Sequence, residues 1–179
     1  MRILIVSDTH GYDSNLRIVL EKIGQPDCMI HLGDSESTLE NLRSISNCPV
    51  YMVAGNCDYF TRLPVARIEE LDGCRIFMTH GHYYYVSVGV RDLAEEARTN
   101  GCKVAMFGHT HRPFIDESDP DLTILNPGSL SFPRQEGHRP SYILMETAAG
   151  QKPAFTLRYL DHNLVKKILK RGRKDTEKA

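Results

Sequence analysis

Short apolar runs separated by helix-period stretches are the feature that most limits what this chain can fold into. In the first half, apolar runs at residues 2–7, 28–31 and 50–53 alternate with two stretches whose apolar residues recur every three or four positions. The first of these stretches can be capped by Asp13 or Ser14. Strands that alternate with helices in this way form parallel sheets with helical crossovers. The pattern therefore predicts an α/β fold.

The second half of the chain is richer in strands. Two apolar runs flank Asp72-Gly73, a pair of residues typical of the turn that joins antiparallel strands. A helix is expected near residues 90–100. The remaining expected elements are strands at residues 66–71, 74–79, 103–107, 114–117, 123–125, 142–146 and 155–160, and a last helix from about Asn163. We expect two sheets packed face to face with helices outside, in a single domain spanning residues 1–179.

Charge and cysteine content exclude several classes of function. The formal net charge is −1 over 179 residues, so there is no global electrostatic attraction to nucleic acid or to an acidic membrane. The one basic cluster is the C-terminal tail, which we expect to be solvated and flexible from about residue 171. No apolar stretch reaches the roughly 20 residues that a membrane span needs. Five cysteines without a CxxC pair argue against a disulfide framework and favour a reducing, cytoplasmic location.

Polar motifs follow five of the predicted strands at the point where each strand ends. They are Asp8-Thr9-His10, Gly33-Asp34, Gly55-Asn56-Cys57-Asp58, His80-Gly81-His82 and Gly108-His109-Thr110-His111. Each motif alone has an ordinary interpretation as a turn or a surface histidine. Ligands of open α/β sheets bind at the carboxyl ends of strands, so five motifs at five such ends can converge on one site.

In this order, the motifs resemble the pattern of the calcineurin-like metallophosphoesterase superfamily. The short length, the Gly55-Asn56-Cys57-Asp58 motif and the segment Asn126-Pro127-Gly128-Ser129 are most similar to its small YfcE-like phosphodiesterase branch. The resemblance implies a four-layer αββα sandwich of two mixed β-sheets flanked by helices. It also implies a metal-dependent phosphodiesterase that acts on a small phosphodiester.

The resemblance further implies two divalent metal ions per chain. Carried over residue by residue, the ligands would be Asp8, His10 and His111 for the first ion, Asn56, His80 and His109 for the second, and Asp34 as a bridge between them. Imidazole and carboxylate ligands suit Mn²⁺, Ni²⁺, Fe²⁺ or Zn²⁺, and manganese is the expected metal. Two such ions can share a hydroxide that attacks the phosphate ester.

Cys57 departs from the wider superfamily, many of whose members carry a histidine there that is thought to protonate the leaving group. A thiol is a poorer acid at this position. His82 is the candidate substitute; the alternative is that it only forms hydrogen bonds near the site. Asn56 and Asp58 are the other expected catalytic residues, with Asp58 orienting its neighbours.

The expected substrate contacts come from Cys57, Asn126 and Ser129, whose polar groups can meet phosphate oxygens. An ordinary turn is the alternative interpretation of residues 126–129. Arg134 is a further candidate contact for an anion.

Two other classes of function compete with the enzyme. A scaffold that binds a protein partner can keep the fold after losing catalysis, as the small retromer subunit does. Retention of all seven ligands favours the enzyme over the scaffold. A structural zinc protein is excluded because structural zinc sites are closed four-ligand cages rich in cysteine. We expect no membrane or stable nucleic-acid partner, and self-association into a homo-oligomer is open.

Overall fold

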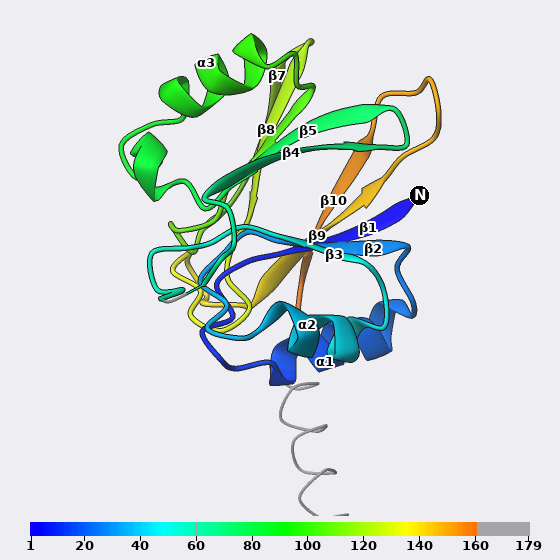
Figure 1. The fold of residues 1–179 in the computed structure, drawn as a ribbon, viewed down its shortest axis with the longest axis vertical. Helices are drawn as coiled ribbons and strands as arrows, with labels where there is room; N and C mark the ends of the chain where they lie inside the picture. Colours follow the sequence, from blue (N-terminus) through cyan, green and yellow to red (C-terminus); the bar gives the residue numbers. More distant parts are fainter. Residues whose placement is uncertain (60, 161–179) are drawn as a thin grey trace, which may run out of the picture.

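Two five-stranded mixed sheets form the centre of the computed structural model, which describes residues 1–59 and 61–160 (Figure 1). The first sheet has the strand order β10-β9-β1-β2-β3, with β1 (Arg2–Val6), β2 (Cys28–His31), β3 (Val50–Met52), β9 (Ser141–Glu146) and β10 (Ala154–Tyr159). The second has the order β4-β5-β6-β8-β7, with β4 (Ala66–Leu71), β5 (Cys74–Thr79), β6 (Val104–Met106), β7 (Pro113–Asp119) and β8 (Leu122–Pro127).

Parallel strands occupy the middle of both sheets. In the first sheet β1, β2 and β3 run parallel, and β9 and β10 are added antiparallel at one edge. In the second sheet β5, β6 and β8 run parallel, whereas β4 and β7 pair antiparallel at the two edges. The carboxyl ends of the central strands of each sheet therefore meet at one edge.

Helices cover the outer face of each sheet (Figure 1). Helices α1 (Ser14–Ile23) and α2 (Leu39–Ser46) pack on the first sheet, and α3 (Arg91–Thr99) packs on the second. A single turn of 3-10 helix, η1 (His82–Tyr84), follows β5. The molecule is thus a four-layer αββα sandwich, and the fold class predicted from the sequence is confirmed.

The core is divided among these layers by the alternation of side chains along each strand. In β1, Ile3 and Ile5 pack between the two sheets, whereas Leu4 and Val6 pack beneath α1 and α2. All four side chains are fully buried. Burial on both faces explains why this strand reads as a continuous apolar run instead of an alternating one.

Local signals place several element boundaries. Asp72 and Gly73 both have positive φ, 53° and 77°, as the tight turn between β4 and β5 requires. Helix α2 begins at Leu39 because Thr38 caps it by accepting a hydrogen bond from the Asn41 N–H at 3.1 Å. Strand β8 runs on to Pro127, so Asn126 belongs to a strand.

The described residues include no helix with the length and apolar character that a bilayer crossing requires. The predicted last helix near Asn163 and the basic tail lie outside the described residues.

Candidate metal centre

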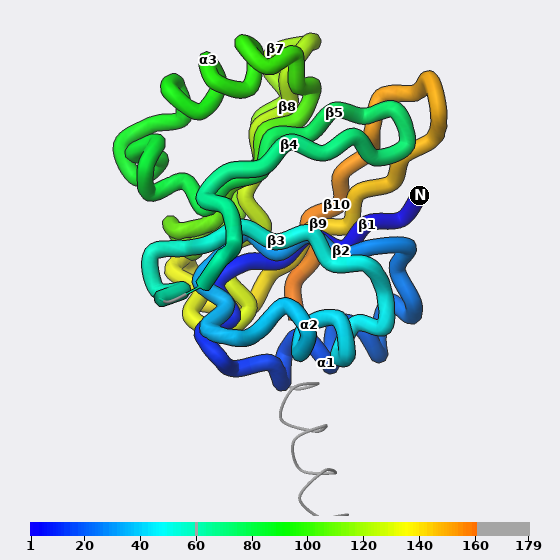
Figure 2. The backbone as a smooth tube through the Cα atoms, viewed as in Figure 1, coloured from blue at the N-terminus to red at the C-terminus, as the bar shows by residue number. Residues whose placement is uncertain are grey.

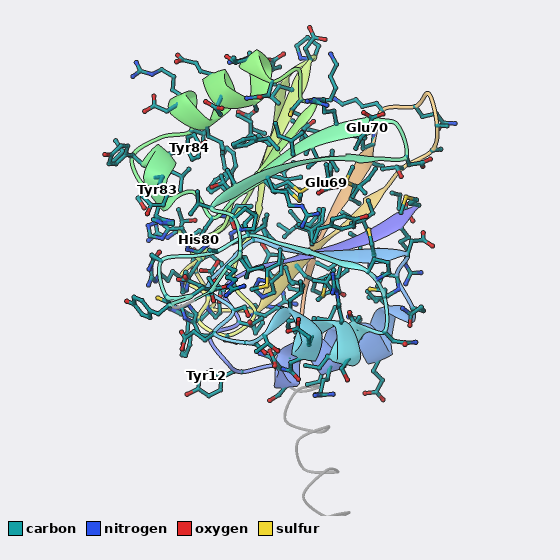
Figure 3. The ribbon with its side chains drawn as sticks, viewed as in Figure 1. Tyr12, Glu69, Glu70, His80, Tyr83 and Tyr84 are labelled. Atoms are coloured by element: carbon teal, nitrogen blue, oxygen red, sulfur yellow. The ribbon has the colours of Figure 1, made fainter. Side chains whose placement is uncertain are left out.

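The five motif-bearing loops gather at the carboxyl ends of the central strands, in the seam between the two sheets. Figure 2 shows these blue, cyan, green and yellow loops on the left of the molecule. Backbone hydrogen bonds join them: the Asp8 N–H donates to the Gly33 carbonyl at 3.1 Å, and the Gly108 N–H donates to the His80 carbonyl at 3.0 Å. His80 lies at this edge, between Tyr12 and Tyr83 in the view of Figure 3. Residues far apart in sequence are thereby brought to one place.

Two glycines allow the loops to approach each other this closely. A Cβ atom on Gly55 would lie 2.1 Å from Oδ1 of Asp34. A Cβ atom on Gly108 would lie 2.1 Å from Oγ of Ser7 and 3.0 Å from Oδ2 of Asp8. Real Cβ atoms cannot occupy these positions, so the motifs need glycine where they have it.

Backbone strain is concentrated at the same edge. Most non-glycine residues avoid positive φ because of steric contacts with Cβ. Here six site residues have φ between 46° and 65°. They are Asp8, His10, Asp34, Glu36, His109 and His111. Such conformations cost on the order of 1–3 kcal/mol each and persist where the surroundings hold them, most often at functional sites.

Asp8, His10 and His111 form one cluster of ligand atoms. Nε2 of His111 lies 3.1 Å from Oδ1 of Asp8 and 3.4 Å from Nε2 of His10. The ligand atoms of the three residues all lie within 4.8 Å of one another, so one ion can be held among them. These are the three residues that the family resemblance assigns to the first ion.

Asp34 and His80 form a second cluster with Asp8. Oδ2 of Asp34 lies 3.4 Å from Nε2 of His80 and 3.9 Å from Nε2 of His10, so this carboxylate stands between the two clusters. At the rim, Oδ1 of Asn56 lies 3.0 Å from Nδ1 of His109, and the rings of His109 and His80 are 5.2 Å apart. A separation of about 3 Å suits two ligand atoms bound to one cation through bonds of about 2.1 Å.

The other ring nitrogen of each inner histidine is already occupied. Nδ1 of His80 donates to the Leu32 carbonyl, and Nδ1 of His111 donates to the Phe132 carbonyl, each at 2.7 Å. Nδ1 of His10 donates to Oε1 of Glu36 at 2.8 Å. These bonds fix the tautomer and leave Nε2 as the lone-pair donor facing the centre, the usual arrangement of metal-binding histidines.

Buried polar atoms without partners indicate what this centre lacks. Both carboxylate oxygens of Asp8 are buried without a hydrogen bond, and so is Nε2 of His80. Buried polar atoms nearly always have partners, and an unpaired buried carboxylate is especially unfavourable. Divalent cations bound among these atoms would satisfy all three, so the donor set fits the metal ions that the fold implies.

The pKa values of the site reflect burial and neighbouring charge. Burial raises the pKa of Asp34, but the His80 ring and the Cys57 N–H, which donates to Oδ1 at 2.7 Å, outweigh it and hold the pKa below its usual range. Burial lowers the pKa of His80, but the nearby Asp34 and Asp8 carboxylates more than offset it and raise the pKa overall. Burial and the adjacent His80 lower the pKa of His109.

Asp58 joins two of the loops through hydrogen bonds to their backbone. Its Oδ1 accepts hydrogen bonds from the backbone N–H groups of Ser35 and Glu36, at 3.0 and 2.8 Å, and its Oδ2 accepts from Gly55 at 2.8 Å. A carboxylate used in this way holds the loop that carries Asp34 against the loop that carries Asn56. Asp58 therefore acts on the centre through its neighbours.

Two supporting residues were missed by sequence reasoning. Glu36 holds His10 and also forms a group with His10 and Cys57 whose ligand atoms lie within 4.8 Å of one another. Its place two residues after Asp34 is the signal that could have identified it. His31 is fully buried; its Nδ1 accepts from the Gly33 N–H at 3.3 Å and its Nε2 lies 3.1 Å from Oγ1 of Thr9. Burial lowers its pKa to about 4, so it is neutral near pH 7.

The predicted substrate contacts Asn126 and Ser129 are buried and already hydrogen-bonded. Nδ2 of Asn126 donates to the Gly108 carbonyl at 2.7 Å and to Oγ1 of Thr110 at 3.1 Å. Oγ of Ser129 donates to the Asp8 carbonyl at 2.8 Å. With their donor hydrogens used in this way, both side chains position the metal-binding loops, and a direct contact with phosphate stays a prediction.

Cys57 and His82 lie at the rim of the centre. Burial and the neighbouring Asp34 raise the pKa of the half-buried Cys57 thiol to about 11. His82 begins η1; its ring lies 5.5 Å from that of His80 and 6.1 Å from that of His109, and its Nδ1 is buried without a hydrogen bond. Burial, His80 and His109 lower its pKa. The role of each as an acid stays a prediction.

The fold and this centre define a class of protein that comparison with known sequences also identifies. Residues 1–150 match the calcineurin-like phosphoesterase superfamily domain, and the chain belongs to that superfamily. It is 32% identical to YsnB of Bacillus subtilis, described as a probable metallophosphoesterase, over 90% of this chain and 91% of that protein. It is 30% identical to the phosphodiesterase MJ0936 of Methanocaldococcus jannaschii, over 72% of this chain and 83% of that protein.

Solved structures show the same fold. A Streptococcus pneumoniae protein described as a predicted phosphoesterase superposes with a TM-score of 0.71 at 24% identity, over 88% of this chain and 97% of that one. YfcE, a phosphoesterase from E. coli, superposes with a TM-score of 0.58 at 24% identity, over 87% of this chain and 98% of that one. Zinc-bound Vps29 of Entamoeba histolytica superposes with a TM-score of 0.71 at 18% identity, over 90% of this chain and 100% of that one. The predicted resemblance to the superfamily is confirmed, and YfcE shares the fold.

Proposed function

We propose that this protein is a metal-dependent phosphodiesterase that hydrolyses a small phosphodiester at a centre of two divalent cations. The observation that carries the proposal is the set of buried, unpaired ligand atoms: both oxygens of Asp8 and Nε2 of His80. Five further ligand-bearing side chains surround these atoms: His10, Asp34 and His111 within the same clusters, and Asn56 and His109 at the rim. A phosphodiesterase among the relatives supports the choice of a diester.

The first cluster supports an ion held by Asp8, His10 and His111. The second ion would be held by His80 with His109 and Asn56, which lie at the rim beside it, and Asp34 would stand between the two ions. When bound, two such ions supply an activated water and stabilise the negative charge that develops on the phosphoryl group. Manganese is proposed because the donor atoms are imidazole nitrogens and carboxylate or amide oxygens without a thiolate.

The chain's own residues orient this centre and serve the leaving group. The carbonyls of Leu32 and Phe132 and the carboxylate of Glu36 aim the histidines. His82 is the proposed proton donor, since its half-buried ring lies beside those of His80 and His109. A cytoplasmic location is proposed on the strength of five free cysteines in the described residues.

Hydrolysis of bis(4-nitrophenyl) phosphate and of 4-nitrophenyl phosphate by chelator-stripped protein, before and after refilling with Mn²⁺, tests the proposal. We expect activity that requires metal, favours the diester and is lost in Asp34→Asn. Asp121→Asn, the same change at an exposed position in the turn between β7 and β8, is the matched control and should retain activity. Activity retained by metal-loaded Asp34→Asn would contradict the site.

Absence of turnover with Mn²⁺, Ni²⁺, Fe²⁺ and Zn²⁺, despite two bound ions per chain, would instead favour a scaffold that binds a protein partner.

A further inference from the structure

Two open grooves flank the metal centre, one on each side of the seam between the sheets. One, of about 840 Å³, is built from the segments that follow β2 and β3; we name it the acidic groove, and it comprises residues 36–40, 57–59 and 61–63. The other, of about 610 Å³, is built from segments that follow β5, β6 and β8; we name it the basic groove, and it comprises residues 86–90, 107, 110, 112–114 and 134. A phosphodiester has two ester arms, and each groove offers room for one.

The basic groove is joined directly to the metal-binding loops. Val86 and Phe107 in its wall pack against Gly81, where a Cβ atom would lie 2.7 Å from Cγ2 of Val86 and 3.3 Å from Cβ of Phe107. Thr110 in its wall lies between His109 and His111 in the chain. The groove thus begins one residue away from two histidines of the centre, His109 and His111, and packs against the glycine that follows His80.

Charge distinguishes the two grooves. The ionisable residues of the basic groove are Arg112 and Arg134, and it contains no carboxylate. The ionisable side chains of the acidic groove, apart from cysteine and tyrosine, are Glu36, Glu40, Asp58 and Arg62. An anionic group near the centre would therefore be attracted to one side of the seam and repelled from the other.

The two arginines of the basic groove are exposed and make no ion pair with any carboxylate of the described residues. Arg67, Arg91 and Arg98, by contrast, each lie within 4.0 Å of at least one carboxylate. The backbone N–H of Arg134 donates to the His111 carbonyl at 3.0 Å, which anchors this residue to the metal-binding loop. Guanidinium groups in such positions suit carboxylate or phosphate oxygens.

Apolar side chains line the same groove as these arginines. Val88 is 92% exposed and Phe114 is 37% exposed, and the buried Val86 and Phe107 also line it. An occupant that fits this groove has an apolar body and an anionic group.

Resting on the proposed function, we propose that the natural substrate is a phosphodiester with two unlike arms. The arm in the basic groove carries an apolar or aromatic group and a second anionic group, which binds Arg112 and Arg134. The arm in the acidic groove is neutral or cationic. The enzyme thereby selects its substrate by the charge of one arm, at a place separate from the metal ligands.

Three 4-nitrophenyl phosphodiesters of equal aromatic size test this inference: the phenyl, 4-carboxyphenyl and 4-phosphonophenyl esters. The Mn²⁺-loaded full chain is expected to hydrolyse the two anionic esters with a kcat/KM roughly fivefold above that of the phenyl ester, as two exposed ion pairs would give. The ratio of the two anionic esters distinguishes a carboxylate from a phosphate-type group. Added salt should reduce the preference, because exposed charges are screened.

Variants locate the effect. In the double variant Arg112→Ala/Arg134→Ala, the ratio of kcat/KM for the anionic esters to that for the phenyl ester is expected to fall to about one. Arg112→Glu should bring this ratio below one. Arg17→Ala/Arg43→Ala removes two exposed guanidinium groups on α1 and α2 and should leave the preference unchanged. No preference in the wild type, or an equal preference in the basic-groove variant, would overturn the inference.

Calorimetric binding of phenylphosphonate and 4-carboxyphenylphosphonate to the metal-loaded chain provides a second readout that needs no turnover. Tighter binding of the carboxylate, lost in Arg112→Ala/Arg134→Ala, would support the groove even if no ester is hydrolysed. In that case the proposed function alone would fail. Equal affinities of the two ligands would contradict the inference whether or not the protein is an enzyme.

Discussion

At the scale of single residues, the three inner histidines differ in how firmly they are held. His80 and His111 donate to the backbone carbonyls of Leu32 and Phe132, whose positions the fold fixes. His10 donates to Glu36, a side chain that is 45% exposed. The orientation of His10 therefore depends on one carboxylate that can be removed without disturbing the core.

We expect Glu36→Ala to weaken the binding of one of the two ions about 10- to 100-fold, the usual effect of losing the partner of a metal-binding histidine. Glu36→Gln keeps an acceptor oxygen and should lose less. Glu40→Ala removes the same charge four residues away, at an exposed position, and is the matched control. Calorimetric titration of chelator-stripped protein with Mn²⁺ measures both sites; an equal loss in Glu40→Ala would show a general charge effect instead.

At the scale of elements, the loop between β8 and β9 braces the loop after β1. Oγ of Ser129 donates to the Asp8 carbonyl and accepts from the N–H groups of Ser131 and Phe132, at 3.1 and 2.8 Å. The Phe132 carbonyl in turn accepts from His111. The buried Ser129 hydroxyl thus contacts Asp8 directly and supports His111 through Phe132.

Ser129→Ala should lower the free energy of unfolding by about 1–3 kcal/mol, because it leaves buried backbone groups unpaired. Metal binding should weaken as well, since Asp8 and His111 lose their common support. Ser118→Ala, at an exposed position of β7, should change neither. Denaturant unfolding and Mn²⁺ titration measure the two effects, and a Ser129→Ala protein with wild-type values in both would refute this role.

The order of elements and the ligand-bearing motifs could be predicted from the sequence because they depend on local patterns. The apolar runs, the Asp72-Gly73 turn and the motifs at strand ends are all visible in the chain itself. The position of Glu36 two residues after Asp34 indicates that it lies near the centre, but its contact with His10 requires a left-handed backbone at both residues, which the sequence does not show. The role of Ser129 was hidden because nothing in the sequence shows which way a buried hydroxyl points.

At the scale of the whole molecule, the residues that bind metal lower the stability of the metal-free fold. Asp8 is fully buried at the seam, and neither of its oxygens has a hydrogen bond. A buried carboxylate without a hydrogen bond destabilises the metal-free fold, whereas bound cations remove that penalty and stabilise the folded state by mass action. The same aspartate therefore has opposite effects on stability in the two forms.

Asp8→Asn should raise the free energy of unfolding of chelator-treated protein at pH 8 by about 1–3 kcal/mol, because the amide keeps the shape of the carboxylate without its charge. With saturating Mn²⁺ the order should reverse, the wild type becoming the more stable. Thermal unfolding with and without metal measures both. A metal-free Asp8→Asn that unfolds more easily than the wild type would show that the buried carboxylate is compensated within the fold.

The six residues of the centre with positive φ affect what a selection for heat resistance would enrich. Glycine adopts positive φ without the Cβ conflict, so at Asp8, Asp34 or Glu36 it would relieve strain while deleting a metal-binding or supporting group. A library screened for heat resistance in a chelating buffer would therefore enrich proteins that survive heating and no longer bind metal. The same library screened in Mn²⁺ would reject those clones, because they would not gain stability from bound metal. The choice of buffer therefore decides whether laboratory evolution keeps or removes metal binding.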